Sequence, residues 1–447
     1  MFQMLGKGDR SAPINLLGDL LAKVTDIGIR MGAGKRLPEE TLLHHCEELL
    51  RKEGEATSLA QASYILDRYQ NLSVEEKRDF FLEILQHFGT NDAALEKAVE
   101  AWKQNKSSSS SRALHFASEP RSQHLIRRLN QAPNATLKLV NMRSDLLGFV
   151  RSHAELKALD QDFSHLFVSW FNRGFLQLER IDWETSAAVL EKIIAYEAVH
   201  EIRRWKDLRL RVAAPDRRLY AYFHPALGME PLIFVEVAIT AKTPEAIAPI
   251  LCDERTHLNP NEATTAVFYS ISNCQSGLKG ISFGNFLIKQ VVESLHREFP
   301  NLKTFVTLSP VPGFRKWSLA QPSNPDPLTT KQDLAFIVQL EKAKADGTLL
   351  AFISSDNKLK KLAAKYLVAT RSPRGGASDP VSRFHLGNGA RLENIHSTAD
   401  VSPNGLDNAW GCMVNYQYTV ADIEKNHEAY SNGDDIIISP TVHSLLK

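Results

Sequence analysis

Apolar residues recur at helical spacing through the first 170 residues of the chain. One stripe runs through Leu59, Ala62, Ile65 and Tyr69, and Ser73 and Glu76 have capping-box spacing ahead of the next. The same spacing predicts further helices over residues 14–24, 92–102, 122–130, 135–152 and 154–169. No alternation typical of strands interrupts them, so residues 1–170 are predicted to form an all-α helical bundle.

Five consecutive serines, Ser107–Ser111, lie between two of these helices. Polar low-complexity runs of this kind are common in flexible connections. We therefore expect a mobile surface loop within the bundle.

After about residue 170 the apolar pattern alternates as it does in strands. Strands are expected over 175–181, 219–223, 232–239 and 413–418, with helices over 186–205, 334–345 and 358–367. Residues 371–379 form a glycine-rich basic loop that could act as a flap. The chain thus reads as an α+β multidomain protein, with the helical bundle followed by a mixed α/β domain over residues 171–447.

The stretch 265–317 contains one complete crossover unit. A strand over 265–272, a loop with three glycines, a helix that stops at Pro300 and a second strand over 303–308 follow one another. Unpaired N–H groups at a helix N-terminus favour a phosphate, and Gly277, Gly280 and Gly284 would let it approach. The spacing is neither the dinucleotide fingerprint nor the Walker pattern, so an ordinary turn fits equally well.

Ser309 follows the second strand of this unit and precedes Pro310. In open α/β sheets, ligands bind beyond the carboxyl ends of the strands. The hydroxyl of Ser309 is therefore a candidate to face a ligand, although an ordinary Ser-Pro loop explains it too.

Composition excludes several classes of protein. The 447 residues carry a formal net charge of +1, which gives no reason to expect a nucleic acid or a membrane surface as partner. The four cysteines are far apart, which argues against a zinc ribbon or a disulfide scaffold and suits a reducing cytosol. His44, His45 and Cys46 are consecutive and would point to different faces of a helix, so we expect no metal site there.

Several longer motifs together resemble the malonyl-CoA decarboxylase family. They are IIAYEAVHEIRRW at 193–205, FYSIS at 268–272, LKGISFGNFLIK at 278–289, REFPNLKTFVTLSPVPGF at 297–314, FHLGNGA at 384–390 and NYQY at 415–418. The resemblance implies a helical bundle followed by a domain similar to the acyl-CoA N-acyltransferase superfold. It also implies an enzyme of fatty acid metabolism that converts malonyl-CoA to acetyl-CoA and CO2, as a homotetramer built through the helical region. Because we find no signal, transit or peroxisomal motif, a bacterial cytoplasmic location is expected.

The same resemblance assigns roles to particular residues. Ser309 and His385 would be the catalytic pair, Ser309 orienting the carboxylate and His385 giving a proton to the enolate. Ser270 and Tyr418 would assist as donors. The CoA pyrophosphate would rest on Lys279, Gly280, Ile281, Ser282, Phe283, Gly284 and Asn285. At Ser282 some relatives carry a carboxylate, which this chain lacks.

No metal and no organic cofactor is expected, because the thioester is itself the electron sink. Two rival functions remain open: an acyl-CoA-dependent N-acyltransferase of the same fold, and an acyltransferase using Cys274 or Cys412 with His385. The cationic run between residues 203 and 218 fits a solvated face, or contacts to CoA phosphates or to a neighbouring subunit.

Overall fold

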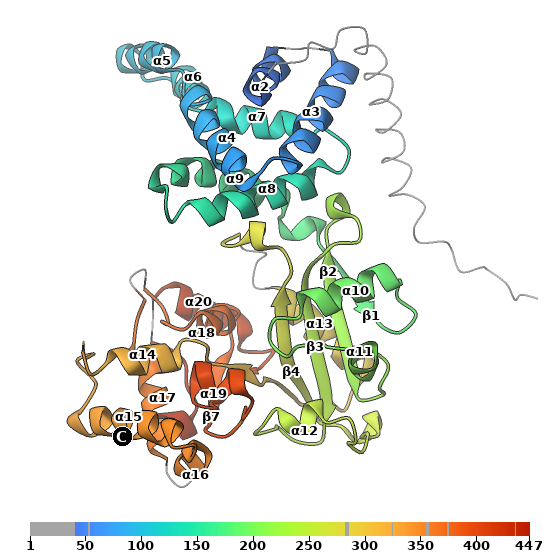
Figure 1. Cartoon of the computed structure of the whole chain (residues 1–447), viewed down its shortest axis with the longest axis vertical. Coiled ribbons are helices and arrows are strands. Elements are labelled where there is room, and N and C mark those ends of the chain that lie inside the picture. Colours follow the sequence, from blue (N-terminus) through green and yellow to red (C-terminus); the bar gives the residue numbers. More distant parts are fainter. Residues whose placement is uncertain are drawn as a thin grey trace, which may run out of the picture. The chain divides into compact units, whose positions relative to one another are not determined.

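The computed structural model describes residues 41–51, 54–281, 286–323, 325–354, 357–372, 375–433 and 435–447, so the helix expected over 14–24 lies outside the described residues. The chain forms two compact units (Figure 1). One comprises Met1–Gln177 with two later segments, Phe223–Glu230 and Gln275–Ser282, and the other comprises the remainder.

The first unit is helical, as the apolar spacing predicts. Ser73 and Glu76 form the expected capping box, with the Glu76 N–H donating to Ser73 Oγ and the Ser73 N–H to Glu76 Oε2. The helices are α2 (Leu42–Arg51), α3 (Glu55–Gln70), α4 (Val74–His87), α5 (Asp92–Gln104), α6 (Ser108–Ala117), α7 (Arg121–Leu129), α8 (Ala135–Phe149) and α9 (Lys157–Trp170).

The prediction of a mobile loop at the serine run Ser107–Ser111 is wrong. Ser107 is the N-cap of α6, whose first turn is made of serines. Ser107 Oγ accepts from the Ser110 N–H, and Ser110 Oγ accepts from the Ser107 N–H. Serine hydroxyls satisfy the unpaired donors of a helix start, so the run begins a helix instead of interrupting one.

Within this unit, the short 3₁₀ turn η5 (Ser276–Leu278) packs on α8. A Cβ at Gly277 would lie 1.8 Å from the carbonyl oxygen of Val140, so only glycine fits. Arg143, buried on α8, donates to the carbonyl oxygens of Gly277 and Lys279 at 2.7 and 3.1 Å. Close helix packing, and not the approach of a phosphate, therefore explains Gly277.

The second unit is built on one sheet of eight strands in the order β1-β2-β3-β4-β5-β8-β6, with β7 beside β8. β4 and β5 are parallel neighbours joined by α13, which confirms the expected crossover unit. The strands are β1 (Gln177–Ile181), β2 (Arg217–Phe223), β3 (Pro231–Thr240), β4 (Thr265–Asn273), β5 (Thr304–Thr307), β6 (Ser309–Pro310), β7 (Arg391–His396) and β8 (Met413–Tyr418).

Helices of this unit connect the strands and follow the last of them. They are α10 (Ala187–Tyr196), α11 (Trp205–Val212), α12 (Ala248–Leu251), α13 (Phe286–Glu298), α14 (Phe314–Ala320), α15 (Lys331–Ala345), α16 (Leu349–Ser354), α17 (Lys358–Ala364), α18 (Pro380–Gly387), α19 (Pro403–Ala409), α20 (Ile423–Ser431) and α21 (Pro440–Leu445). None of the described helices is long and apolar enough to cross a membrane.

The single helix expected over 186–205 is wrong, because α10 ends at Tyr196 and α11 begins at Trp205. The carboxylate of Glu197, the residue after α10, accepts from the N–H groups of the following residues Val199 and His200, at 2.9 and 2.6 Å, and this ends the helix. A carboxylate that accepts from nearby N–H groups offers the backbone an alternative to the helical ladder.

The strand β8 brings the carboxyl end of the crossover unit together with the end of the chain. It pairs with β5 near Tyr418 and with β6 near Val414, so the short step between β5 and β6 lies along one partner strand. Thr307 and Ser309 are two residues apart, and their hydroxyls contact each other at 2.8 Å. Ser309 thereby lies on β6, paired with β8, in contact with the groups described next.

Candidate active site

A cavity of about 220 Å³ lies in the second unit at the carboxyl end of β4. It is smaller than the roughly 300–1,000 Å³ of sites for drug-sized ligands, and it suits a small acyl group. None of the described lining residues carries a charged side chain at neutral pH. They are Val199, Phe268, Tyr269, Ser270, Ile271, Asn273, Ser309, Pro310, Pro380, Val381, Phe384 and His385.

The structure brings Ser309 and His385 together in this cavity, with Ser309 Oγ 3.0 Å from His385 Nε2. His385 lies in the last turn of α18, whose N-cap is the buried Asp379. Asp379 Oδ1 accepts from the N–H groups of Val381 and Ser382, and the carboxylate also accepts from the N–H of Gly313. Because Gly313 follows Ser309 by four residues, one carboxylate ties the Ser309 loop to the start of the His385 helix.

Hydroxyl groups surround this pair behind the cavity wall. Tyr418 OH lies 2.8 Å from His385 Nδ1, and Tyr418 is not among the residues that line the cavity. Ser309 Oγ donates to Thr307 Oγ1, which also accepts the N–H of Tyr416. The ring of Tyr416 stacks on the imidazole with centroids 4.7 Å apart, so packing and hydrogen bonds hold the orientation of the ring.

Burial controls the protonation of His385. Desolvation of the charged form lowers the pKa of His385 to about 3, compared with about 6.5 for a solvated imidazole. The ring is therefore neutral near pH 7. It carries one hydrogen, so it can donate through one nitrogen and accept through the other.

Ser270 lies in the cavity wall, but its hydroxyl is committed to a carboxylate. Ser270 Oγ donates to the two oxygens of Glu197 at 2.9 and 2.8 Å, and Ser272 Oγ donates to the same carboxylate at 3.2 Å. The role of assisting donor proposed for Ser270 would require its hydrogen to leave Glu197. The sequence assigns no role to Glu197, and its place in the motif IIAYEAVHEIRRW at 193–205 is the one signal that points to it.

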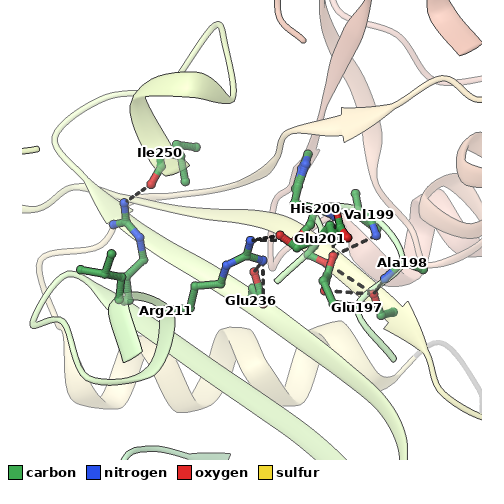
Figure 2. A network of polar contacts seen from close by, with 12 residues as sticks. Glu197, Ala198, Val199, His200, Glu201, Arg211, Glu236 and Ile250 are labelled. Atoms are coloured by element: carbon green, nitrogen blue, oxygen red, sulfur yellow. Dashed lines mark hydrogen bonds and ion pairs between the residues drawn. The ribbon is translucent and has the colours of Figure 1, made fainter. Parts of the chain in front are cut away.

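The turn that carries Val199 is tied to a buried ion pair between Arg211 and Glu236 (Figure 2). Arg211 donates to Glu236 at 2.9 Å and to the carbonyl oxygen of His200 at 2.7 Å. Burial raises the pKa of Glu236 to about 7, while Arg211 opposes that shift.

The cationic run between residues 203 and 218 is therefore only partly a solvated face. Arg211, Arg217 and Arg218 are buried. Ion pairs join them to Glu236, Asp216 and Glu298 of the same unit. Hydropathy alone could not separate these residues from their exposed neighbours, because two of the partners, Glu236 and Glu298, lie on other elements.

Of the predicted CoA loop, the structure describes only Lys279, Gly280 and Ile281. Gly280 has φ +83°, a conformation that favours glycine, and a Cβ there would meet no atom within 4 Å. Ser282, Phe283, Gly284 and Asn285 lie outside the described residues. The assignment of the loop to CoA stays a prediction.

The cysteine alternative finds no support in the geometry. Both ring nitrogens of His385 contact hydroxyl groups, those of Ser309 and Tyr418. Cys412 is buried, and burial raises its pKa, which opposes thiolate formation. Within the described ranges, no group of three His, Cys, Asp or Glu residues is placed to hold a metal ion.

Comparison with known proteins places this chain in a family. The model of the malonyl-CoA decarboxylase C-terminal domain matches residues 174–447, and that of the N-terminal domain of the same enzyme matches residues 88–171. The chain belongs to the malonyl-CoA decarboxylase family. The resemblance inferred from the motifs is thereby confirmed, and so is the expectation of a carboxy-lyase.

Solved members of the family share the architecture. The malonyl-CoA decarboxylase of Rhodopseudomonas palustris is 48% identical, with 90% of this chain and 98% of that chain covered and a TM-score of 0.82. That of Agrobacterium vitis is 49% identical, with 91% and 99% covered and a TM-score of 0.82. The mitochondrial malonyl-CoA decarboxylase of Anser anser anser is 35% identical over 353 residues, covering 73% of this chain and 69% of that protein. The expected fold class, a helical region followed by a mixed α/β domain, is confirmed.

Proposed function

We propose that this chain converts malonyl-CoA to acetyl-CoA and CO2, with the malonyl group in the cavity that holds Ser309 and His385. Membership of the family supports the reaction. The single observation that carries the site is the pair itself, a serine hydroxyl and a neutral imidazole 3.0 Å apart in the wall of a small cavity.

The lining explains why a carboxylate would be lost here. No described cationic side chain faces the cavity, so the substrate carboxylate would exchange water for an apolar wall with a few neutral donors. Loss of CO2 moves the negative charge to the thioester oxygen and removes the poorly solvated group. The hydroxyl of Ser309 would rotate from Thr307 to the carboxylate and orient the breaking C–C bond perpendicular to the thioester plane.

His385 would then supply the proton. The electron pair of the broken bond enters the thioester carbonyl, and the carbon of the resulting enolate takes the hydrogen of Nε2. Tyr418 OH, 2.8 Å from Nδ1, gives its proton to the ring as Nε2 loses one, so the imidazole stays neutral. A solvent proton enters at Nε2 and the Nδ1 hydrogen returns to Tyr418, which balances one proton per turnover.

The remainder of the substrate would bind through the glycine loop. Lys279, Gly280 and Ile281 with the four following residues would hold the CoA pyrophosphate, and Ser282 would stand where some relatives carry an assisting carboxylate. The reaction needs neither a metal nor an organic cofactor, because the thioester accepts the electrons.

We also propose a homotetramer formed through the helical region, acting in fatty acid metabolism in a bacterial cytoplasm. α5 and α6 of that region contribute no buried residue within the chain, which fits helices whose contacts lie on another copy.

The deciding measurement is CO2 release from purified protein given malonyl-CoA in the presence of EDTA. We expect acetyl-CoA and CO2 in equal amounts with no other substrate added. If acetyl-CoA were consumed only when an amine is supplied, and malonyl-CoA were untouched, the N-acyltransferase alternative would replace this proposal.

A further inference from the structure

We propose that Thr307 is a positioning residue that fixes the tautomer of His385, so that the hydrogen of the neutral ring sits on Nε2, the nitrogen facing the cavity. Neither the sequence motifs nor the assigned roles single out this threonine. Its effect on turnover rests on the proposed function, whereas the tautomer is a property of the resting protein.

The first step concerns the hydrogen of Ser309. A serine hydroxyl has one hydrogen, and the geometry directs it to Thr307 Oγ1 at 2.8 Å. Thr307 is 0% exposed, so water does not compete for that bond. Thr307 is itself fixed, because its hydroxyl accepts the Tyr416 N–H at 3.1 Å and its carbonyl oxygen accepts Asn415 Nδ2 at 2.8 Å.

The second step assigns the ring hydrogen. Ser309 donates its single hydroxyl hydrogen to Thr307 Oγ1. In the 3.0 Å contact with His385, Ser309 Oγ must therefore be the acceptor, and Nε2 must carry the hydrogen. Nδ1 of the neutral ring is then bare and accepts from Tyr418 OH at 2.8 Å. The three hydrogen bonds therefore form a chain in which all point the same way: Tyr418 donates to His385, His385 to Ser309, and Ser309 to Thr307.

The direction of this chain decides whether the ring can deliver a proton into the cavity. His385 and Ser309 line the cavity, whereas Tyr418 does not, so Nε2 is the nitrogen nearer to a substrate. Without the Thr307 hydroxyl, Ser309 would be free to donate to Nε2. The ring hydrogen would then move to Nδ1, and a lone pair would face the enolate.

The test is ¹⁵N NMR of the imidazole nitrogens in full-length protein labelled on histidine, with the His385 signals assigned by their loss in His385→Asn. We expect the Nε2–H form in the wild type and in Thr307→Ser, and the Nδ1–H form in the nearly isosteric Thr307→Val. The kcat for CO2 release should fall about 10²-fold in Thr307→Val, the low end of what a positioned proton donor contributes, with KM unchanged. Thr307→Ser, which keeps the hydroxyl, should retain a kcat close to that of the wild type.

A second variant keeps the test decisive if Thr307→Val does not fold. Tyr418→Phe removes the donor at the other end of the chain, and the Nε2–H form should persist because the Thr307 end decides. An Nδ1–H form in the wild type or in Tyr418→Phe would overturn the proposal. An Nε2–H ring in a protein that releases no CO2 would instead refute the proposed function and leave the assignment of the tautomer intact.

Discussion

His385 owes its chemistry to the groups around it. A solvated imidazole titrates near pH 6.5, but burial lowers the pKa of this one to about 3. The side chain is therefore a neutral N–H donor at pH 7, as in enzymes where a neutral histidine polarises a carbonyl. A proton donor of this kind does not lose its hydrogen as the pH rises through 6 or 7.

Two substitutions test the reacting groups. Ser309→Ala and His385→Asn should each lower kcat by about 10²–10⁴-fold, because each removes a group placed at the reacting atoms, while KM changes little. Steady-state kinetics of CO2 release measures both constants. His443→Asn, at an exposed position of α21, is the matched control and should leave kcat unchanged. Wild-type turnover in His385→Asn would show that another group delivers the proton.

The pH dependence follows from the same burial. Between pH 6.5 and about 3 the unfolded chain binds a proton at His385 that the native protein does not, so stability falls as the pH falls through this window. The free energy of unfolding of His385→Asn, measured by urea titration, should decline less steeply over that range than that of the wild type. Equal slopes would mean that the native ring titrates normally. Within the range where the protein stays folded, the kcat profile should lack a step near pH 6.5.

At the scale of elements, two polar side chains position the cavity walls. Asp379 caps α18 and holds the Gly313 N–H, so it sets the distance between the Ser309 loop and the helix of His385. Arg211 holds the turn after α10 through the carbonyl oxygen of His200. Both act on the site without lining the cavity.

Removal of the α18 cap should lower both stability and turnover. Asp379→Ala leaves three N–H groups without their acceptor, for a loss of about 1–2 kcal/mol in the free energy of unfolding and a fall in kcat. Asp379→Asn keeps an acceptor oxygen and should retain most of both. Ser439→Ala, which removes the cap of the remote helix α21, should cost stability alone. If kcat were equally lowered there, the effect would be general.

Variants of the buried Arg211–Glu236 ion pair can distinguish its effect on stability from its effect on the cavity wall. Arg211→Met leaves Glu236 without its cationic partner and should cost about 3–5 kcal/mol by urea titration. The double variant Arg211→Met/Glu236→Met should recover much of this loss. KM for malonyl-CoA should stay raised in both variants, because the His200 carbonyl oxygen still lacks its donor. A double variant with normal KM would show that this hydrogen bond does not shape the cavity.

Local pattern predicted the elements better than the contacts between them. The helices of the first unit and the β4-α13-β5 crossover follow from apolar spacing, and motifs brought Ser309 and His385 into consideration. The early end of α10 depends on the hydrogen bonds that the Glu197 carboxylate accepts from the N–H groups of Val199 and His200. Thr307 acts on Ser309, two residues away, but it is held in place by Tyr416, more than a hundred residues away, and no local pattern reveals that contact.

At the scale of the whole molecule, the units are not consecutive stretches of sequence. The chain passes from one unit to the other at 177/178, 222/223, 230/231, 274/275 and 282/283. Gly277 belongs to the helical unit although it lies in the crossover loop, and it contacts the backbone of Val140.

Gly277→Ala tests that packing. The added Cβ would lie 1.8 Å from the Val140 oxygen, and we expect a loss of about 3 kcal/mol or more in the free energy of unfolding. Gly148→Ala on α8 is the matched control, since a Cβ there meets no atom within 4 Å. It should be neutral or stabilise by up to about 1 kcal/mol. Thermal melts compare the two, and equal melting temperatures would contradict the close approach.

The place of Gly277 limits how relatives of this protein can be recombined. A chimera joined near residue 172 takes α8 from one parent and the segment 275–282 from the other. Val140 and Arg143 would then have to fit a partner loop with which they did not co-evolve. Exchanging that loop together with the helical region keeps the pair matched, and such a hybrid should express where the simple splice fails.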